Sequence, residues 1–304
     1  MSTMIRSCWW HGARVPGVGS FDLQVPGGSL AEDLAKAGFT AYIMDIRGYG
    51  RSTRPKEMSD PPNNIRLWYA QTTLSAISTQ RLTRSESGPA GSESRSLVGR
   101  PVGQWGGYYA ALHSDKLSHV VIHNALYGAN TPQPLVGHGS DLEDPSHPGQ
   151  FNPAVGAYRW NAAPSLLAGW DKSIPVDNKS EWRDPVVAEA YVREALASDS
   201  AAAGHNPPAF RSPNGAMEDS FYLATGRQLW DASFITVPTL VIASERDFWS
   251  RPEDRELLIA HLVHAPIRRL VTIPDATHFV HLDRNEHGRR QFLDALIQFC
   301  RKEL

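Results

Sequence analysis

The chain has 304 residues, and 41% of them are hydrophobic, which is enough to build a sizeable core in one large domain or in a core with an inserted lobe. The formal net charge of -2 and the lack of a basic stripe exclude the electrostatic field that attracts nucleic acid. The two cysteines lie at opposite ends of the chain, and no apolar run suits a signal peptide or a membrane helix, so we expect a cytoplasmic protein without a membrane span.

The first half of the chain alternates helix-like and strand-like runs. Leu30–Gly38 carries apolar residues at helical spacing and ends on a glycine, which predicts a helix. Phe39–Met44 and His119–His123 are short apolar runs that indicate strands, and a further helix is expected over Trp105–His113. This alternation favours the α/β class, with a mostly parallel sheet and helices on its faces.

The composition changes between residues 126 and 230. Proline, glycine, tryptophan and asparagine become frequent there, and one clear helix, Pro185–Ala197, is expected inside the segment. Such a texture is typical of an inserted helical lid rather than of sheet strands. We therefore assign residues 1–125 and 231–304 to the α/β core and residues 126–230 to the lid.

Two further strands and a final helix are expected after the lid. Thr239–Ala243 and Arg269–Ile273 have the apolar pattern of strands, and Gly288–Lys302 is amphipathic at helical spacing. Polar residues follow both strands, at the strand ends where parallel α/β sheets place their active sites.

Asp247 and His278 are the candidates for catalysis at these strand ends. A carboxylate there can accept the Nδ1 proton of a histidine and leave its Nε2 free as a general base. Asp247 is preferred to Glu245 because it stands further beyond its strand. His278 is preferred to His287 and to His281, for which a solvated or supporting position is expected.

Two motifs near the N-terminus follow a known pattern. The first is His11-Gly12, a glycine turn, and the second is the loop from Asp45 to Ser52, which reads D-x-R-G-x-G-x-S. Together with the acid and the histidine above, they make most of the chain outside residues 126–230 resemble the α/β-hydrolase family. The resemblance implies that fold, and it implies that the second loop is structural rather than catalytic.

The resemblance also implies an oxyanion hole, a set of N–H groups that stabilise negative charge on a reacting carbonyl. Gly12 and Ala13 are its candidates, with the Ala13 N–H as the donor. In the family an apolar strand precedes this glycine turn, but residues 1–10 are short and mixed in character. We therefore expect the leading strands to be missing or replaced.

The nucleophile of the family is not found in the sequence. Its elbow, G-x-S-x-G, should stand between a strand and the helix that is expected at Trp105. Gly99–Gly103 has the glycine spacing but holds Pro101 at its centre, and a second register holds Gln104 there. Neither side chain can attack a carbonyl carbon.

Residues 65–104 as a whole are anomalous, because they are polar and show neither a helix nor a convincing strand. Moving the codon boundary two bases onward permits P-P-L-V-R-S-N-D-A-V-R-D-I over Ile65–Ser78 and G-W-A-T-G-G or G-W-S-T-G-G over Val98–Gly103. We hypothesise that the segment is read out of frame, with Arg100 at the nucleophile position, and we expect it to pack poorly. A decayed elbow and a lineage-specific loop are the alternatives.

The expected ancestral activity is hydrolysis of an ester or related acyl bond by a nucleophile–histidine–aspartate triad, which needs no cofactor. The expected substrate is a small, apolar, ester-like molecule, and the chain as written is expected to be inactive. The alternative is a non-catalytic pseudoenzyme or ligand-binding protein of the same fold. A dehalogenase or epoxide hydrolase would need an aspartate at the elbow, and the shifted frame offers none. Six aromatic residues of the lid would either line the substrate pocket or pack the lid on the core: Trp160, Trp170, Trp182, Phe210, Phe221 and Tyr222.

Overall fold

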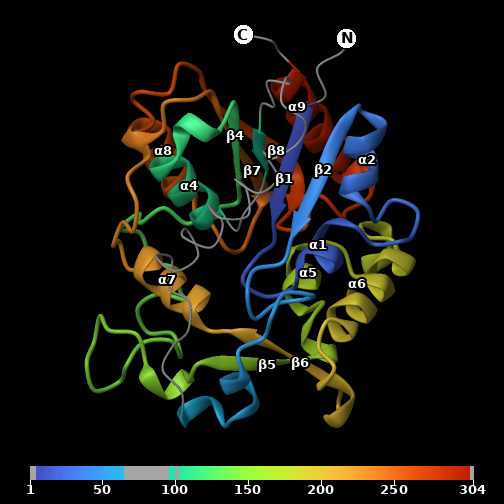
Figure 1. Ribbon diagram of the computed structural model, residues 1–304, viewed down its shortest axis with the longest axis vertical. Coiled ribbons are helices and arrows are strands. Elements are labelled where there is room, and N and C mark those ends of the chain that lie inside the picture. The colour runs from blue at the N-terminus through green and yellow to red at the C-terminus, as the bar shows by residue number, and fades with distance from the viewer. Residues whose placement is uncertain (1–4, 65–95, 100–102, 302–304) are drawn as a thin grey trace.

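The computed structural model describes residues 5–64, 96–99 and 103–301 (Figure 1). Its centre is a six-stranded sheet in the order β2-β1-β3-β4-β7-β8, in which every neighbouring pair is parallel. The expected α/β class is thereby confirmed. The six strands are β1 (Ile5–Trp10), β2 (Phe39–Met44), β3 (Ser96–Gly99), β4 (His119–His123), β7 (Thr239–Arg246) and β8 (Arg268–Thr277).

Helices cover both faces of this sheet. On one face α4 and α8 pack against Val120 and Ile122 of β4, and on the other α2 and α9 pack close to Val121. Because side chains alternate along a strand, this arrangement buries β4 on both sides. The helices around the sheet are α1 (Gly17–Phe21), α2 (Leu30–Lys36), α4 (Gly103–Leu112), α8 (Pro252–His261) and α9 (Arg289–Arg301).

Element boundaries agree with the sequence where the local pattern is strong. β2 and β4 have the bounds expected for them, and α9 buries Phe292 and Leu296 as its spacing predicts. β7 and β8 run further than expected because they keep pairing through an irregularity between Ser244 and Arg246. The last of these pairs joins Arg246 to Thr277, so the residues that follow the two strands emerge side by side.

The start of the chain differs from the expectation. β1 lies between β2 and β3 and leads directly into His11, so the strand before the glycine turn is neither missing nor replaced. Ser7, Cys8, Trp9 and Trp10 are all buried. A parallel strand covered on both faces needs no alternation of polar and apolar residues, which is why its mixed sequence concealed it.

The anomalous segment 65–104 also contains a strand that its side-chain pattern did not indicate. β3 pairs with β1 along its whole length and with β4 at Leu97 and Val98. The hydrogen bonds between strands join backbone groups. A segment that pairs with a strand on each side can therefore form a strand even when its sequence lacks a clear apolar pattern. We expected this strand to be missing or poorly formed, and the presence of β3 shows that it is not missing.

The junction from β3 to α4 is the place where the elbow was expected. Residues 65–95 and 100–102, and with them Arg100 and Pro101, lie outside the described residues. The expected poor packing of the segment and the frame hypothesis therefore stay predictions.

Residues 126–230 lie at the end of the molecule toward which the strands of the sheet point, opposite both termini (Figure 1). Within the described residues, no strand of this inserted segment joins the main sheet. The segment is less helical than expected, because two of its strands form a small antiparallel sheet. The buried positions of one of these strands include arginine and serine, so its sequence lacks the apolar pattern that would have indicated a strand. Its elements are α5 (Ala168–Ser173), α6 (Pro185–Ala197), α7 (Gly215–Ala224), β5 (Tyr158–Ala162) and β6 (Ala209–Pro213).

Short 3-10 helices lie in the connections. Across the described ranges, none of the helices is both long and apolar enough to cross a bilayer. The 3-10 helices are η1 (Lys56–Ser59), η2 (Pro62–Asn64), η3 (Ser114–Lys116), η4 (Pro153–Val155), η5 (Ala163–Ser165), η6 (Lys179–Glu181), η7 (Ala202–Gly204), η8 (Ala232–Phe234) and η9 (Asn285–His287).

Candidate active site

Asp247 and His278 meet at the carboxyl edge of the sheet, directly after β7 and β8. The Nδ1 of His278 lies 2.6 Å from Oδ1 of Asp247, which confirms the hydrogen bond expected between them. Because an ionised carboxylate only accepts, Nδ1 carries the proton, and Nε2 is the basic nitrogen of the neutral ring. The two side chains thus have the geometry of a general base and its orienting acid.

The Asp247 carboxylate is buried and held by further donors. Its Oδ1 accepts the Trp249 N–H at 3.0 Å, and its Oδ2 accepts the N–H and the hydroxyl of Ser250 at 3.0 and 2.5 Å. Burial alone raises the pKa of this carboxyl, but the His278 ring and these hydrogen bonds hold the pKa below its ordinary value. Asp247 therefore remains ionised and can stabilise positive charge on the imidazole.

The other candidates from the sequence have different surroundings. Glu245 accepts the Asp275 N–H at 2.7 Å, so its carboxylate holds a backbone turn rather than a histidine. His281 is buried and lines the same cavity as His278, so of the two positions expected for it, solvated or supporting, only the solvated one is excluded. His287 stacks on Trp182 with their ring centroids 3.9 Å apart.

Asn124 is a residue of the site that the sequence analysis missed. It follows β4 with a φ of 47°, a left-handed conformation that asparagine tolerates better than most residues. Its side chain accepts the Ser244 N–H at 2.8 Å and donates to the Ser244 hydroxyl at 3.0 Å and to the His278 carbonyl at 3.4 Å. The available signal was a polar residue directly after an expected strand.

The glycine turn at Gly12 and Ala13 is positioned by His11. The His11 Nε2 accepts the Ile46 N–H at 3.1 Å, so the neutral ring carries its proton on Nδ1 and donates it to the Gly12 carbonyl at 2.7 Å. Burial lowers the pKa of His11, which keeps the ring neutral. Since the carbonyl and N–H of a trans peptide point in opposite directions, the Ala13 N–H points away from His11.

The loop from Asp45 to Ser52 has the structural character that the family resemblance implies. Asp45 accepts the N–H groups of Gly17 and Arg51 at 2.7 and 2.8 Å, and its carbonyl accepts the Ser52 hydroxyl at 2.6 Å. Gly50 has a φ of 48°, and a Cβ there would lie 2.1 Å from Oδ2 of Asp45. Only glycine therefore lets this loop close around the carboxylate.

A cavity of about 400 Å³ opens beside His278, and Gly12 and Ala13 line it too. Small-molecule sites usually have volumes of about 300–1,000 Å³, so the cavity suits a compact ligand. Core and inserted segment both contribute to its wall. Its aromatic side chains are Phe21, Tyr191, Phe248, Trp249 and Phe279.

The six aromatic residues that the sequence analysis considered for this lining are absent from it. Trp170, Trp182 and Phe210 belong to one buried cluster within and beneath the inserted segment, and Phe221 is fully buried. Of the two interpretations left open, packing is therefore the correct one for these four residues.

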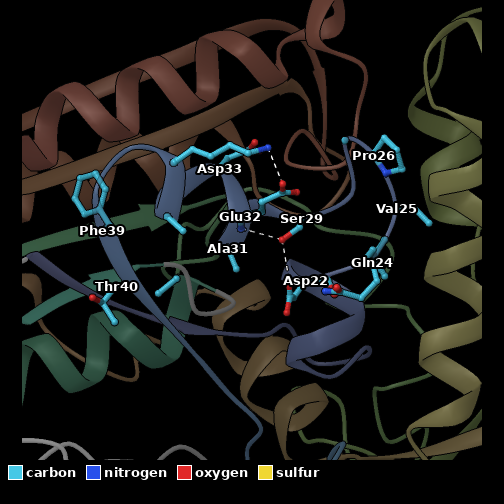
Figure 2. Close-up of a pocket in the computed structure, with 15 residues that line it drawn as sticks. Asp22, Gln24, Val25, Pro26, Ser29, Ala31, Glu32, Asp33, Phe39 and Thr40 are labelled. Atoms are coloured by element: carbon cyan, nitrogen blue, oxygen red, sulfur yellow. Dashed lines mark hydrogen bonds and ion pairs between the residues drawn. The ribbon is translucent and has the colours of Figure 1, made fainter.

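A larger hollow of about 930 Å³ lies elsewhere, around the turn that precedes α2 (Figure 2). Its polar groups bind one another: the Ser29 hydroxyl donates to Asp22 at 2.7 Å and accepts the Glu32 N–H at 2.9 Å, and Glu32 pairs with Lys36 at 2.7 Å. Its lining has no histidine, so despite its size it offers no general base of the kind found in His278. Within the described chain, no three histidine, cysteine or acidic side chains are grouped to hold a metal ion.

Comparisons with known proteins agree with this arrangement. The model of the family described as "Alpha/beta hydrolase family" matches residues 8–292. Among solved structures, an esterase from Exiguobacterium antarcticum has a TM-score of 0.61 at 15% identity, with 99% of this chain and 94% of that chain covered. An enol-lactonase from Burkholderia xenovorans LB400 has a TM-score of 0.56 at 19% identity, with 97% and 91% covered.

A hydrolase from Pseudomonas aeruginosa PA01 is similar to the same extent, with a TM-score of 0.58 at 19% identity and 98% and 91% of the two chains covered. No curated protein sequence matches the chain. At these identities the structural likeness shows the shared fold alone.

Proposed function

Because the chain belongs to the α/β-hydrolase family, we propose that the ancestral activity of the site at His278 is hydrolysis of an ester or related acyl bond of a small molecule. The observation that carries the proposal is the 2.6 Å contact between the buried Asp247 carboxylate and His278. Gly12 and Ala13 border the same cavity, which supports an oxyanion hole there. The esterase and the enol-lactonase among the structural neighbours carry names from this class of acyl chemistry.

In the proposed reaction His278 moves one proton twice. Its Nε2 takes the proton of the nucleophile as that atom bonds to the acyl carbon, and Asp247 stabilises the resulting imidazolium. His278 then gives the proton to the leaving group, and an activated water releases the acid in a second, equivalent step. The Ala13 N–H, aimed away from His11, is the proposed donor to the oxyanion.

The inserted segment 126–230 is proposed to act as a lid over this reaction. Arg159 and Tyr191 of the segment share the cavity wall with His278 of the core. A substrate between them would be shielded from bulk water, which strengthens the electrostatic interactions within the site.

The nucleophile belongs to the junction between β3 and α4, where Arg100 and Pro101 stand in this sequence. A guanidinium stays protonated and proline has no attacking atom, so we propose that the chain as written lacks acyl-enzyme turnover. The shifted reading frame, with serine or alanine at position 100, is proposed as the parent sequence. Sequencing the coding DNA across residues 60–106 decides this point directly.

The activity test compares the chain as written with two variants in which residues 65–103 follow the shifted frame, one with serine and one with alanine at the elbow. The serine variant should hydrolyse activated esters and bind one equivalent of a serine-directed phosphonate, while the alanine variant and the chain as written should do neither. Stoichiometric labelling of the chain as written, abolished by changing one serine elsewhere, would show that the nucleophile has been misplaced.

A further inference from the structure

Two arginines line the cavity beside His278, one from each part of the molecule. Arg14 follows the glycine turn of the core, and Arg159 lies on β5 of the inserted segment. The described lining contains no aspartate or glutamate. The wall that faces a ligand therefore carries two cations without an acidic neighbour in it.

Arg159 is bound by neutral acceptors. Its Nη2 donates to the Ala13 carbonyl at 2.7 Å, and its Nη1 donates to the Pro213 carbonyl at 3.1 Å and to the Asn214 side chain at 3.0 Å. Within the described ranges, no carboxylate lies within ion-pair distance of it, and its Nε has no acceptor from the protein. The guanidinium is held in place by neutral groups, and the described part of the chain supplies no carboxylate to compensate its charge.

Arg14 is held in the same way. Its Nε donates to Asn161 at 3.1 Å, its Nη2 donates to the Ser165 hydroxyl at 2.6 Å, and its carbonyl accepts the Ser212 hydroxyl at 2.8 Å. Among the residues that the structure describes, its Nη1 has no protein acceptor and its charge has no carboxylate partner. Asn161, the acceptor of the Arg14 Nε, stands two positions after Arg159 on β5. The side chains of Asn161 and Arg159 therefore lie on the same face of the small sheet.

Arg211, on the neighbouring strand, shows how the protein treats a structural arginine. The register pairs Arg159 with Ser212, so Arg159 and Arg211 lie on opposite faces of the small sheet. Arg211 donates to both oxygens of the fully buried Asp199, at 2.7 and 2.8 Å. Among the described residues there is thus an acid for the arginine that faces away from the cavity and none for the arginine that lines it.

Arg14 and Arg159 are half-buried, and holding them there without a described counter-charge is costly, because even partial removal of a cation from water is unfavourable. Burial lowers the pKa of Arg159 to about 10 and also lowers the pKa of Arg14. An anionic ligand would supply the missing charge and could accept the N–H groups left over on both guanidinium groups. Arginine matches a carboxylate especially well because its planar fork can donate two parallel hydrogen bonds.

We propose that the substrate carries a carboxylate that binds between Arg14 and Arg159 while its acyl bond lies at His278. The inference rests on the proposed acyl hydrolysis, and it replaces the apolar, ester-like substrate expected from the sequence with an acidic ester. The aromatic side chains of the wall, among them Phe248 and Phe279, would then enclose the carbon chain between the carboxylate and the ester.

The test measures binding rather than turnover, so a missing nucleophile does not affect it. Isothermal titration of the full chain as written compares three esters on one scaffold: monomethyl glutarate, neutral dimethyl glutarate and cationic methyl 4-aminobutyrate. The monoester should bind at least about tenfold more tightly than the other two, since hydrogen bonds to charged groups are the stronger kind. Equal or weaker binding of the monoester, or none that is measurable, overturns the inference even if esters are hydrolysed.

Variants then assign the charge to its residue. Arg159→Gln should weaken monoester binding about 10- to 100-fold and leave dimethyl glutarate unchanged, whereas Arg159→Lys should retain part of the preference. Arg193→Gln removes the same charge from the exposed face of α6 and should change neither affinity. If the Arg159→Gln variant unfolds at a markedly lower temperature than the natural chain, Arg14→Gln provides the second measurement of monoester binding. Unchanged affinity in a folded Arg159→Gln variant, or an equal loss in Arg193→Gln, contradicts the proposal.

Discussion

The two hollows of the molecule differ in how their polar groups are satisfied. Around the larger one, Ser29 binds Asp22 and the Glu32 N–H (Figure 2), and Glu32 pairs with Lys36. Around the smaller one, a histidine has its base nitrogen available and two arginines lack a carboxylate partner within the described chain. A candidate site therefore differs from an ordinary surface hollow in having polar and charged groups without a partner in the described chain, and not in its volume.

The strongest test of this contrast uses the serine variant and replaces, one at a time, the Asp247 carboxylate that binds His278 and a carboxylate that lines the larger hollow. Asp247→Asn should lower kcat on the order of 10⁴-fold, because the amide holds His278 in the wrong tautomer. Asp22→Asn should leave kcat unchanged, because that carboxylate only accepts from the Ser29 hydroxyl. Ester hydrolysis at saturating substrate measures both. Loss of activity in Glu245→Gln, with Asp247→Asn active, would reassign the acid.

Asn124 should matter for stability because it joins two strand ends. Asn124→Ala removes the acceptor of the buried Ser244 N–H and places alanine at a φ of 47°, so the free energy of unfolding should fall by about 2–4 kcal/mol. Urea unfolding measures the change. A loss below about 0.5 kcal/mol would mean that water or a relaxed backbone replaces this bond.

The buried carboxyl group of Asp283 should make the stability of the protein depend on pH. Burial raises the pKa of this carboxyl to about 6, against an ordinary value of 3.8, although Trp170 and Thr277 donate to it. The folded state therefore holds the proton more tightly than the unfolded state does. Its contribution to stability is complete below about pH 4 and is lost as the pH rises through about 6.

Relative to an Asp283→Asn variant, the natural chain should thus lose about 1–3 kcal/mol of unfolding free energy between pH 4 and pH 7. Denaturant unfolding of both chains at several pH values gives this difference directly, and it cancels the titration of other groups. A difference that is constant, or that grows in favour of the natural chain as the pH rises, would contradict the raised pKa.

The larger hollow should affect stability alone. The Ser29 hydroxyl caps α2 by accepting the Glu32 N–H, so Ser29→Ala should cost about 1 kcal/mol of unfolding free energy. Monomethyl glutarate should bind this variant as it binds the natural chain. A changed affinity would extend the site beyond the cavity at His278.

The sequence by itself determined the class of fold and pointed to two residues of the candidate site. The local spacing of apolar residues predicted β2, β4 and α6 correctly, because the signal for each of these elements lies within its own short stretch of sequence. Asp247 and His278 were found because they follow apolar strands whose ends share one edge in any parallel sheet. β1 was missed because burial on both faces makes its side-chain pattern uninformative, and β3 was missed because its pairing with β1 and β4 joins backbone groups rather than a side-chain pattern.

Only the tertiary structure decided which polar groups meet. It paired His278 with Asp247 and placed Glu245 on the Asp275 N–H. Glu245 and Asp247 stand only two positions apart, so the local sequence could not decide which of them binds the histidine. It also set Arg159 in the wall of the cavity and left its charge without a described acid. Such contacts join residues far apart in the chain, so their energy depends on the assembled fold and leaves no periodic trace in the sequence.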